Sequence, residues 1–131
     1  MRTRVSGWLL AAALVVHLLA LYLPGSPDPG PDVVPHLDKL VHVLLFATPA
    51  LLICRITSKW WPIVAMAAHA PVSELVQYRL VPHRSGDVWD LVADAVGVIL
   101  GLGLASLAAR RDAGAPAELG LQYGEGLEQS R

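Results

Sequence analysis

Residues 87–109 read DVWDLVADAVGVILGLGLASLAA, and this stretch decides how the chain is built. Its first eight residues include three aspartates, whereas no Asp, Glu, Lys or Arg occurs from Ala95 to Ala109. On a helix, residues spaced three or four positions apart share a face. One face of this stretch therefore carries acidic residues in its first turns and only Gly and Ala in the turns that follow. The members of this face are Asp87, Asp90, Asp94, Gly97, Gly101, Ala105 and Ala108.

Three other long stretches, Val5–Pro27, Leu40–Cys54 and Trp60–Ser73, also lack Asp, Glu, Lys and Arg. Of the 131 residues, 54% are hydrophobic and 16% are charged, compared with about 25% charged residues in ordinary soluble domains. A soluble domain of this size buries too small a share of its surface to hide so much apolar area. The pattern therefore excludes a soluble globular domain and a disordered chain. A net charge of −1 offers no basic surface for nucleic acid, so the sequence predicts a polytopic membrane protein.

The first apolar run, Val5–Leu23, is long enough to cross a bilayer by itself, because a span needs about 20 apolar residues. It also fits a signal peptide, since Arg2 and Arg4 precede the apolar segment. The run is long for a signal peptide and lacks a clean A-x-A cleavage site. We therefore interpret it as a retained helix.

The other three uncharged stretches each give only about 22 Å of helix, which is shorter than the hydrocarbon core of about 30 Å. Each helix must therefore extend into residues that carry charge. We expect helices from about Lys39 to Arg55, from Trp61 to about Leu80, and from about Val88 to about Ala108. The predicted fold class is all-α, a polytopic four-helix transmembrane bundle over residues 1–111, followed by a flexible cytoplasmic tail over residues 112–131.

The distribution of Lys and Arg predicts the orientation of the bundle. The segments on the side of the N-terminus hold seven of the ten, namely Arg2, Arg4, Arg55, Lys59, Arg110, Arg111 and Arg131. The segments on the other side hold Lys39, Arg79 and Arg84. We therefore predict a multi-pass protein of the cell membrane with both termini in the cytoplasm. Pro24–Leu37 is then an extended external crossover, and the short Ile56–Trp60 turn makes the second and third helices an antiparallel hairpin.

Polar residues fall at matching depths on three of these helices. At a rise of about 1.5 Å per residue, Glu74 and Asp94 lie about 10 and 9 Å below the outer boundary, and His42 about 5 Å below it. The inner half of the predicted membrane region has no comparable group. We therefore predict an outward-opening ligand-binding site formed by Asp38, Lys39, His42, Glu74, Gln77, Arg84, Asp87, Asp90 and Asp94.

A carboxylate in hydrocarbon costs about 2.5–3.5 kcal/mol unless it is paired or hydrated, so intramembrane acids are functional candidates. The candidate catalytic groups are His42, Glu74 and Asp94. A structural interpretation stands beside this one, in which Lys39 or Arg84 pairs with nearby carboxylates only to hold the helix ends together.

Gly97 and Gly101 form a G-x-x-x-G pattern, which lets a neighbouring helix approach closely. We expect the third helix to be that neighbour. Pro49 lacks an N–H, so the backbone carbonyl of Leu45, four residues earlier, has no hydrogen-bond donor within its own helix. His17 and His69, each alone on its helix, are interpreted as interhelical hydrogen bonds rather than as ligands.

The order and spacing of these groups resemble the VanZ-like family of small bacterial integral membrane proteins. The matching segments are DKLVH (Asp38–His42) followed by Phe46, ELVQ (Glu74–Gln77), and RSGDVWDLVADAVG (Arg84–Gly97) with Gly101 beyond. The resemblance extends from the first helix to about Ala108. It departs from the family pattern at Asp94, where Asn is usual. Asp94 would then act protonated or metal-bound, or the role of the amide would be lost.

The resemblance implies a role in the cell envelope, because the family is named for a protein associated with low-level resistance to the glycopeptide antibiotic teicoplanin. It does not by itself distinguish an enzyme from a binding protein. The first hypothesis is a protein that binds or modulates an envelope lipid or a lipophilic antibiotic, with membrane lipids around it and no nucleic-acid partner. The oligomeric state is left open.

The second hypothesis is an intramembrane enzyme that acts on an envelope-lipid headgroup. His42 or Glu74 would be the general base, Asp90 and Asp94 would orient it or hold a divalent metal, and Arg84 would stabilise a phosphate. No helix carries a metal signature such as H-E-x-x-H, so no motif implies a metal or other cofactor. The third hypothesis, an ion-coupled transporter, ranks last because four helices are few for transport.

Overall fold

The computed structural model describes the backbone of residues 2–28, 36–84 and 86–128, and the side chains of residues 7–28, 36–84 and 86–113. Over these ranges the chain forms four helices and no strand: α1 (Arg2–Tyr22), α2 (Leu37–Ile56), α3 (Trp61–Leu80) and α4 (Val88–Glu128). The predicted all-α class is confirmed.

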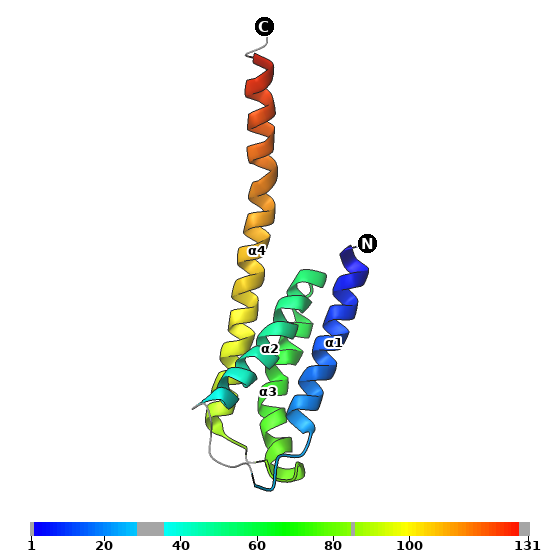
Figure 1. Cartoon of the computed structure of the whole chain (residues 1–131), viewed down its shortest axis with the longest axis vertical. Helices are drawn as coiled ribbons and strands as arrows, with labels where there is room; N and C mark the ends of the chain where they lie inside the picture. The colour runs from blue at the N-terminus through cyan, green and yellow to red at the C-terminus, as the bar shows by residue number, and fades with distance from the viewer. Residues whose placement is uncertain (1, 29–35, 85, 129–131) are drawn as a thin grey trace.

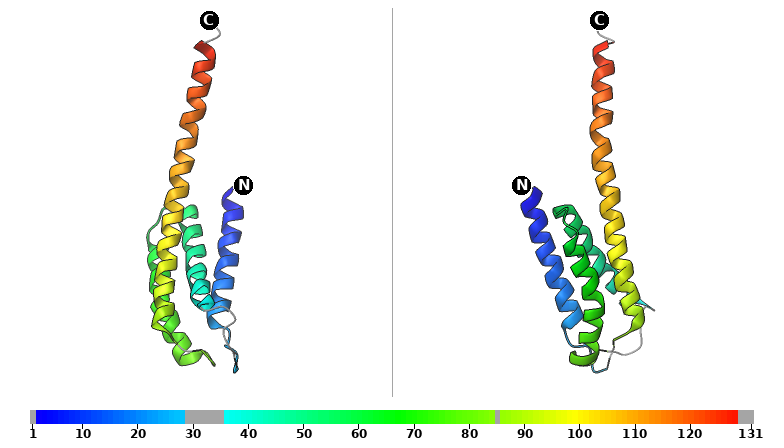
Figure 2. Two further views of the ribbon diagram at one scale, coloured as in Figure 1. Left: turned by 60° about the vertical axis from the view of Figure 1, so that its left-hand side comes forward. Right: turned by 180° about the vertical axis from the view of Figure 1, so that it is seen from behind.

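The four helices alternate in direction along the chain, and α4 extends well beyond the other three (Figure 1). The start of α1, the 57–60 connection and the C-terminal half of α4 lie on one side, as the other views also show (Figure 2). The opposite end, where α1 and α3 end and α2 and α4 begin, is called the loop end below. Because α2 and α4 both begin there, these two helices run parallel.

Helix bounds agree with the sequence prediction to within three residues except at the end of α4. That helix continues to Glu128 rather than ending near Ala108, and whether residues 112–131 are mobile stays a prediction. In the predicted external crossover, residues 24–28 are not helical, and residues 29–35 lie outside the described residues. The 57–60 connection is short, as expected, but α2 makes its most extensive contact with α4.

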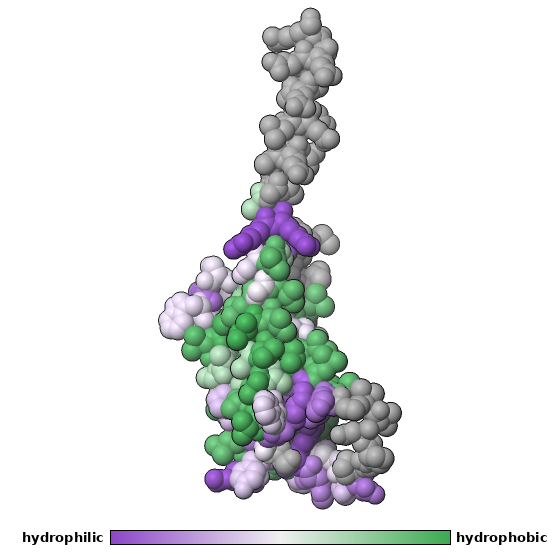
Figure 3. Space-filling model, turned by 90° about the vertical axis from the view of Figure 1, so that its left-hand side faces the viewer, coloured by the Kyte–Doolittle hydropathy of each residue, from purple (hydrophilic) through white to green (hydrophobic). Residues whose placement is uncertain are grey.

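Apolar side chains cover the outside of the bundle. Large exposed residues come from every helix, for example Leu19, Leu44, Val72 and Ile99. The face shown in Figure 3 carries a band of apolar residues between two hydrophilic zones. By length and composition, two helices of the described chain are able to cross a membrane, Leu37–Ile56 and Val88–Ala113. Within α1, Gly7–Tyr22 is a shorter apolar helix.

The interior of the bundle is small and centred on one aromatic ring. Phe46 is fully buried, and it packs in a cluster with Leu21, Met66, Ala70 and Val98. This cluster draws on all four helices. This apolar cluster holds the four helices together and so positions the polar residues that lie nearer to the loop end.

The closest helix contact is made by the small-residue face of α4. A Cβ added to Gly97 would lie 2.5 Å from the Val43 carbonyl oxygen, and one added to Gly101 would lie 2.5 Å from the Ala47 carbonyl oxygen. Both glycines therefore face α2. The prediction that α3 is the closely packed neighbour is wrong, because the glycine face meets the backbone of α2 where that helix runs parallel to it.

This contact gives a matched test of stability. Replacing Gly101 with Ala should lower the free energy of unfolding by about 1–3 kcal/mol, because the new methyl group overpacks against the α2 backbone. Gly103 has nothing within 4 Å of an added Cβ, so Gly103→Ala is the control and should leave stability unchanged or raise it. The measurement is thermal unfolding of the purified protein in detergent, and equal effects at both positions would contradict the assigned contact.

Candidate functional site

The loop end carries a polar cluster whose outer part is organised by one ammonium group. Lys39 Nζ lies 2.7 Å from Asp38 Oδ2, 2.7 Å from Asp87 Oδ2 and 2.6 Å from Asp90 Oδ1. Asp38 and Lys39 belong to the first turn of α2, Asp87 directly precedes α4, and Asp90 lies in its first turn. One Lys therefore joins the starts of α2 and α4 through three charge-assisted hydrogen bonds, which are stronger than neutral ones.

One turn deeper, an imidazole and a carboxylate meet in the interior. His42 Nδ1 lies 2.8 Å from Asp94 Oδ1, and both side chains are buried. The other ring nitrogen, Nε2, faces Asp90 Oδ2 at 3.9 Å, which is too long for a hydrogen bond. Asp94 therefore fixes the orientation of the His42 ring and leaves Nε2 directed at a second carboxylate.

Glu74 brings α3 into the same cluster. Its Oε2 accepts a hydrogen bond of 2.9 Å from the backbone N–H of Asp87, and the side chain is 8% exposed. Its Oε1 is buried and has no hydrogen-bond partner among the described residues, and the same is true of Asp94 Oδ2. The cluster thus contains carboxylate oxygens that protein donors leave unsatisfied, a costly arrangement away from water.

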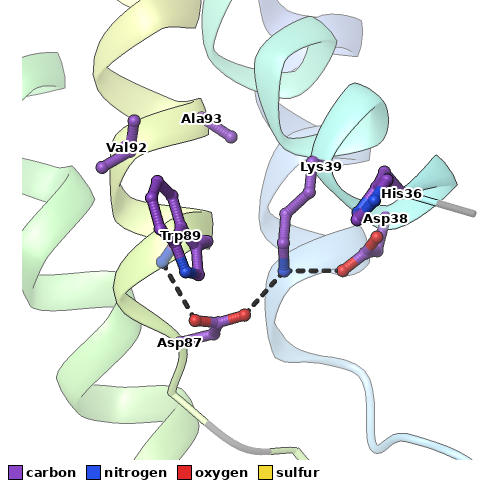
Figure 4. A pocket seen from close by; sticks show the side chains of 7 residues that line it. All are labelled: His36, Asp38, Lys39, Asp87, Trp89, Val92 and Ala93. Carbon is purple, nitrogen blue, oxygen red and sulfur yellow. Dashed lines mark hydrogen bonds and ion pairs between the residues drawn. The ribbon is translucent and has the colours of Figure 1, made fainter.

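A groove of about 810 Å³ opens beside the cluster between the starts of α2 and α4 (Figure 4). One side is charged and the other is apolar, with Trp89, Val92 and Ala93 contributed by the first turns of α4. Among the described residues, the lining consists of His36, Asp38, Lys39, Asp87, Trp89, Val92 and Ala93. The groove is therefore amphiphilic, and its polar side is continuous with the buried cluster through Lys39.

Asp87 lies at the mouth of the groove, outside the apolar helices. The hydrogen bond from Lys39, with a second from the backbone N–H of Trp89, holds the pKa of its carboxyl below the ordinary aspartate value. A negative charge is therefore present at the mouth at neutral pH, even though Lys39 partly offsets it.

Two residues predicted for the ligand site point away from it. Gln77 Nε2 donates to the Leu21 carbonyl at 3.0 Å, and Arg84 Nη2 donates to the Ala20 carbonyl at 2.8 Å. Both carbonyls belong to the last turn of α1, where helix carbonyls lack intrahelical donors, and Pro24 has no N–H to bond Ala20. Gln77 and Arg84 therefore cap α1. Of the two basic residues that the structural interpretation offered as partners of the carboxylates, Lys39 makes this pairing and Arg84 does not.

His17 has a related role in the middle of the bundle. Because Pro49 lacks an N–H, the Leu45 carbonyl has no partner within α2, and His17 Nδ1 binds it at 2.9 Å. A carbonyl only accepts, so Nδ1 carries the proton and donates it. The interpretation of His17 as an interhelical hydrogen bond is confirmed.

The same imidazole continues into a chain of side chains that the sequence did not reveal as a group. His17 Nε2 lies 3.2 Å from His69 Nδ1, and His69 Nε2 lies 2.8 Å from the Tyr22 hydroxyl. With His17 Nδ1 as a donor, every bond is satisfied when Tyr22 donates to His69 and His69 donates to His17. The only signal in the sequence was the position of Tyr22, one turn and a half after His17 on α1.

The predicted site residues therefore divide into two sets. The structure brings together seven of them, from α2, α3 and the start of α4: Asp38, Lys39, His42, Glu74, Asp87, Asp90 and Asp94. Chemically, this set offers an oriented imidazole with a free nitrogen, which is the geometry of a general base or a metal ligand. Ser73 is not an available nucleophile, because its hydroxyl donates to the Ala70 carbonyl, and Ser85 lies outside the described residues.

Comparison of the chain with known protein families, with curated proteins and with solved structures finds no match.

The contact between His17 and Leu45 is testable through a double-mutant cycle. His17→Phe leaves the Leu45 carbonyl buried without a donor, and we expect it to lower the free energy of unfolding by about 1–3 kcal/mol. Pro49→Ala restores the N–H that Leu45 lacks. His17→Phe should therefore cost less in the Pro49→Ala background, measured by thermal unfolding of both single variants and the double variant. Strict additivity of the two substitutions would show that the carbonyl contact contributes nothing.

Proposed function

We propose that the chain is a VanZ-like membrane protein of the bacterial cell envelope, built as four spans with both termini in the cytoplasm. We further propose that its loop end faces outward and binds an amphiphile whose polar end carries amine or hydroxyl groups. An envelope lipid and a teicoplanin-type antibiotic both have this chemistry. The observation that carries the proposal is the groove with one charged and one apolar side.

Two features support the membrane placement. The exposed apolar band on the bundle suits contact with lipid, and a bundle that exposes so many large apolar side chains is poorly suited to water. Charge also favours this orientation, because Arg55 and Lys59 lie at the end opposite the loop end, and Arg110 and Arg111 lie on the same side along α4. α1 and α3 would cross beside α2 and α4, with their polar side chains turned toward neighbouring helices.

Topology is tested with reporter fusions in a bacterial host. A fluorescent protein that folds only in the cytoplasm, fused after Arg131, should be bright, whereas alkaline phosphatase at the same position should be inactive. Phosphatase inserted between Asp28 and Pro29 should be active, because the proposal places that segment outside the cell. The opposite pattern at either position would contradict the four-span arrangement.

Charge balance favours an amine or hydroxyl group over a phosphate as the bound polar end. Lys39 already contacts three carboxylates, and Arg84 donates from Nη2 to the Ala20 carbonyl and is not among the residues that line the groove, so the described groove offers no uncommitted cation to an anion. Asp38 and Asp87 line the polar side of the groove, and both are at least partly exposed. The apolar side continues into the exposed surface of α4, along which an acyl chain would lie.

Trp89 provides a direct readout of occupancy, because it lines the groove while the other tryptophans lie on α1 or near the start of α3. In a Trp8→Phe, Trp60→Phe, Trp61→Phe background the protein is placed in phosphatidylcholine nanodiscs and titrated separately with teicoplanin and with short-chain phosphatidylethanolamine. We expect one of these probes to shift the Trp89 emission saturably. Val92→Phe, which narrows the groove, should weaken binding at least about 10-fold.

Leu104→Phe is the matched control, since Leu104 is an exposed position on α4 far from the groove. This variant should bind the probe as tightly as the unchanged protein does. Saturation by teicoplanin alone identifies the antibiotic as the ligand, and saturation by phosphatidylethanolamine alone identifies the lipid. No saturable response to either probe, or equal effects of Val92→Phe and Leu104→Phe, would overturn the binding proposal.

The pairing of His42 with Asp94 favours a second candidate, an intramembrane enzyme that acts on the bound headgroup. A carboxylate that orients an imidazole is the arrangement of a general base. In that case the protein would turn over the bound probe, and His42→Ala would abolish this turnover while it retains the Trp89 response. A protein that only binds would show the Trp89 response and no turnover of the probe.

A further inference from the structure

Each of three buried side chains at the loop end uses one atom to hold its position and leaves another atom free. His42 uses Nδ1 for Asp94 and leaves Nε2. Asp90 uses Oδ1 for Lys39 and leaves Oδ2 facing His42. Glu74 uses Oε2 for the backbone of Asp87 and leaves Oε1. This is how metal ligands are usually held, with one atom on the ion and the other on a supporting group.

The distances fit a single ion. One ligand atom from each of His42, Glu74 and Asp90 lies within 4.8 Å of the other two, and all three residues are buried. Two ligands bound tetrahedrally to one Zn²⁺ at about 2.0–2.2 Å lie about 3.3–3.6 Å apart. The 3.9 Å between His42 Nε2 and Asp90 Oδ2 is about 0.3 Å longer than this, and two ligand atoms at the 4.8 Å limit would have to approach each other by about 1 Å.

We propose that His42, Glu74 and Asp90, contributed by α2, α3 and α4, bind one divalent transition-metal ion, and that Asp94 is a positioning residue that orients His42. Asp94, His42 and the ion would then form a carboxylate–histidine–metal arrangement, which fixes the tautomer of the ring and raises its basicity as a ligand. The proposal does not depend on which amphiphile occupies the groove.

The strongest independent support is the unsatisfied oxygen of Glu74. This side chain is 8% exposed, and its Oε1 is buried without a hydrogen-bond partner among the described residues. Glu74, Asp90 and Asp94 together carry three carboxylates in a space served by one Lys and one His. A divalent cation would satisfy the orphan oxygen and offset two of these negative charges, where burial makes uncompensated charge costly.

The ligand set also selects the kind of ion. Carboxylates alone suit Mg²⁺ or Ca²⁺, whereas an imidazole among them favours Zn²⁺, Mn²⁺ or Fe²⁺. Three protein ligands leave at least one coordination position for water or for a ligand, as in catalytic rather than structural zinc sites. Zn²⁺ is the best probe because it binds such sites more tightly than Mn²⁺ does.

The test measures Zn²⁺ alone, with no amphiphile present. The full chain, purified in detergent and stripped with chelator, is titrated against a chromophoric zinc indicator. We expect one Zn²⁺ per chain, with Kd raised more than about 10-fold by His42→Ala, Glu74→Gln or Asp90→Asn. Asp94→Asn should raise Kd about 10–100-fold, the range seen when a supporting group of a metal ligand is lost.

Two controls separate this site from unspecific binding. Asp112→Asn makes the same chemical change at the other end of the bundle, where Asp112 pairs with Arg55, and His36→Ala removes an exposed imidazole at the groove. Neither should change the Kd for Zn²⁺. Helical circular dichroism and size-exclusion profiles are recorded for every variant, and Glu74→Gln keeps the oxygen that accepts from Asp87, so it tests the site without removing that contact.

Co²⁺ supplies a signature that a purely structural role of these residues would not give. Substitution of Co²⁺ should produce visible absorption bands of low coordination number, and His42→Ala should abolish them. No stoichiometric Zn²⁺ binding, or binding that the folded Glu74→Gln and Asp90→Asn proteins retain unchanged, would overturn the proposed metal site. Either result would have no bearing on the proposed binding of an amphiphile in the groove, because the Trp89 titration measures that binding independently.

Discussion

The close parallel approach of α2 and α4 sets the geometry of everything at the loop end. Gly101 packs against Ala47 and Ala50, and one turn nearer to the loop end Gly97 packs against Val43 and Phe46. Continuing in the same register, Asp94 meets His42 and then Asp90 meets Lys39. The two helices keep the same register over these turns. Because Gly97 and Gly101 have no Cβ, α2 and α4 come close enough for Asp94 to lie 2.8 Å from His42.

Polar side chains inside this bundle follow two different rules. His17, Gln77 and Arg84 each serve a backbone carbonyl that a proline or a helix end has left without a donor. In an apolar environment such carbonyls must find a partner within the protein. Asp90, Asp94 and Glu74 bring carboxyl groups, which accept hydrogen bonds and do not donate them when ionised. In the structure they gather around the few donors at the loop end, and this arrangement distinguishes the loop-end cluster from the side-chain contacts to carbonyls.

Sequence reasoning was most successful where helical geometry alone determines the answer. The rise per residue placed His42, Glu74 and Asp94 at similar depths, and the start of α3 at Trp61 followed from the charge pattern. What a helix face contacts depends on the order of helices around the bundle, which periodicity does not contain. Glu74 and Gln77 share a face of α3, yet Glu74 reaches the start of α4 and Gln77 reaches α1. For the same reason, the neighbour of Gly97 was misassigned and the link between His17 and His69 was missed.

Asp90 joins the two parts of the loop end, because one of its oxygens binds Lys39 at the groove and the other faces His42 in the interior. A ligand hydroxyl that accepted a hydrogen bond from Lys39 would weaken the bond from Lys39 to Asp90 and leave Asp90 a better partner for a cation inside. A cation inside would in turn weaken the hold of Asp90 on Lys39. Linkage then requires that a ligand in the groove change the affinity for the cation by the same factor by which the cation changes the affinity for the ligand.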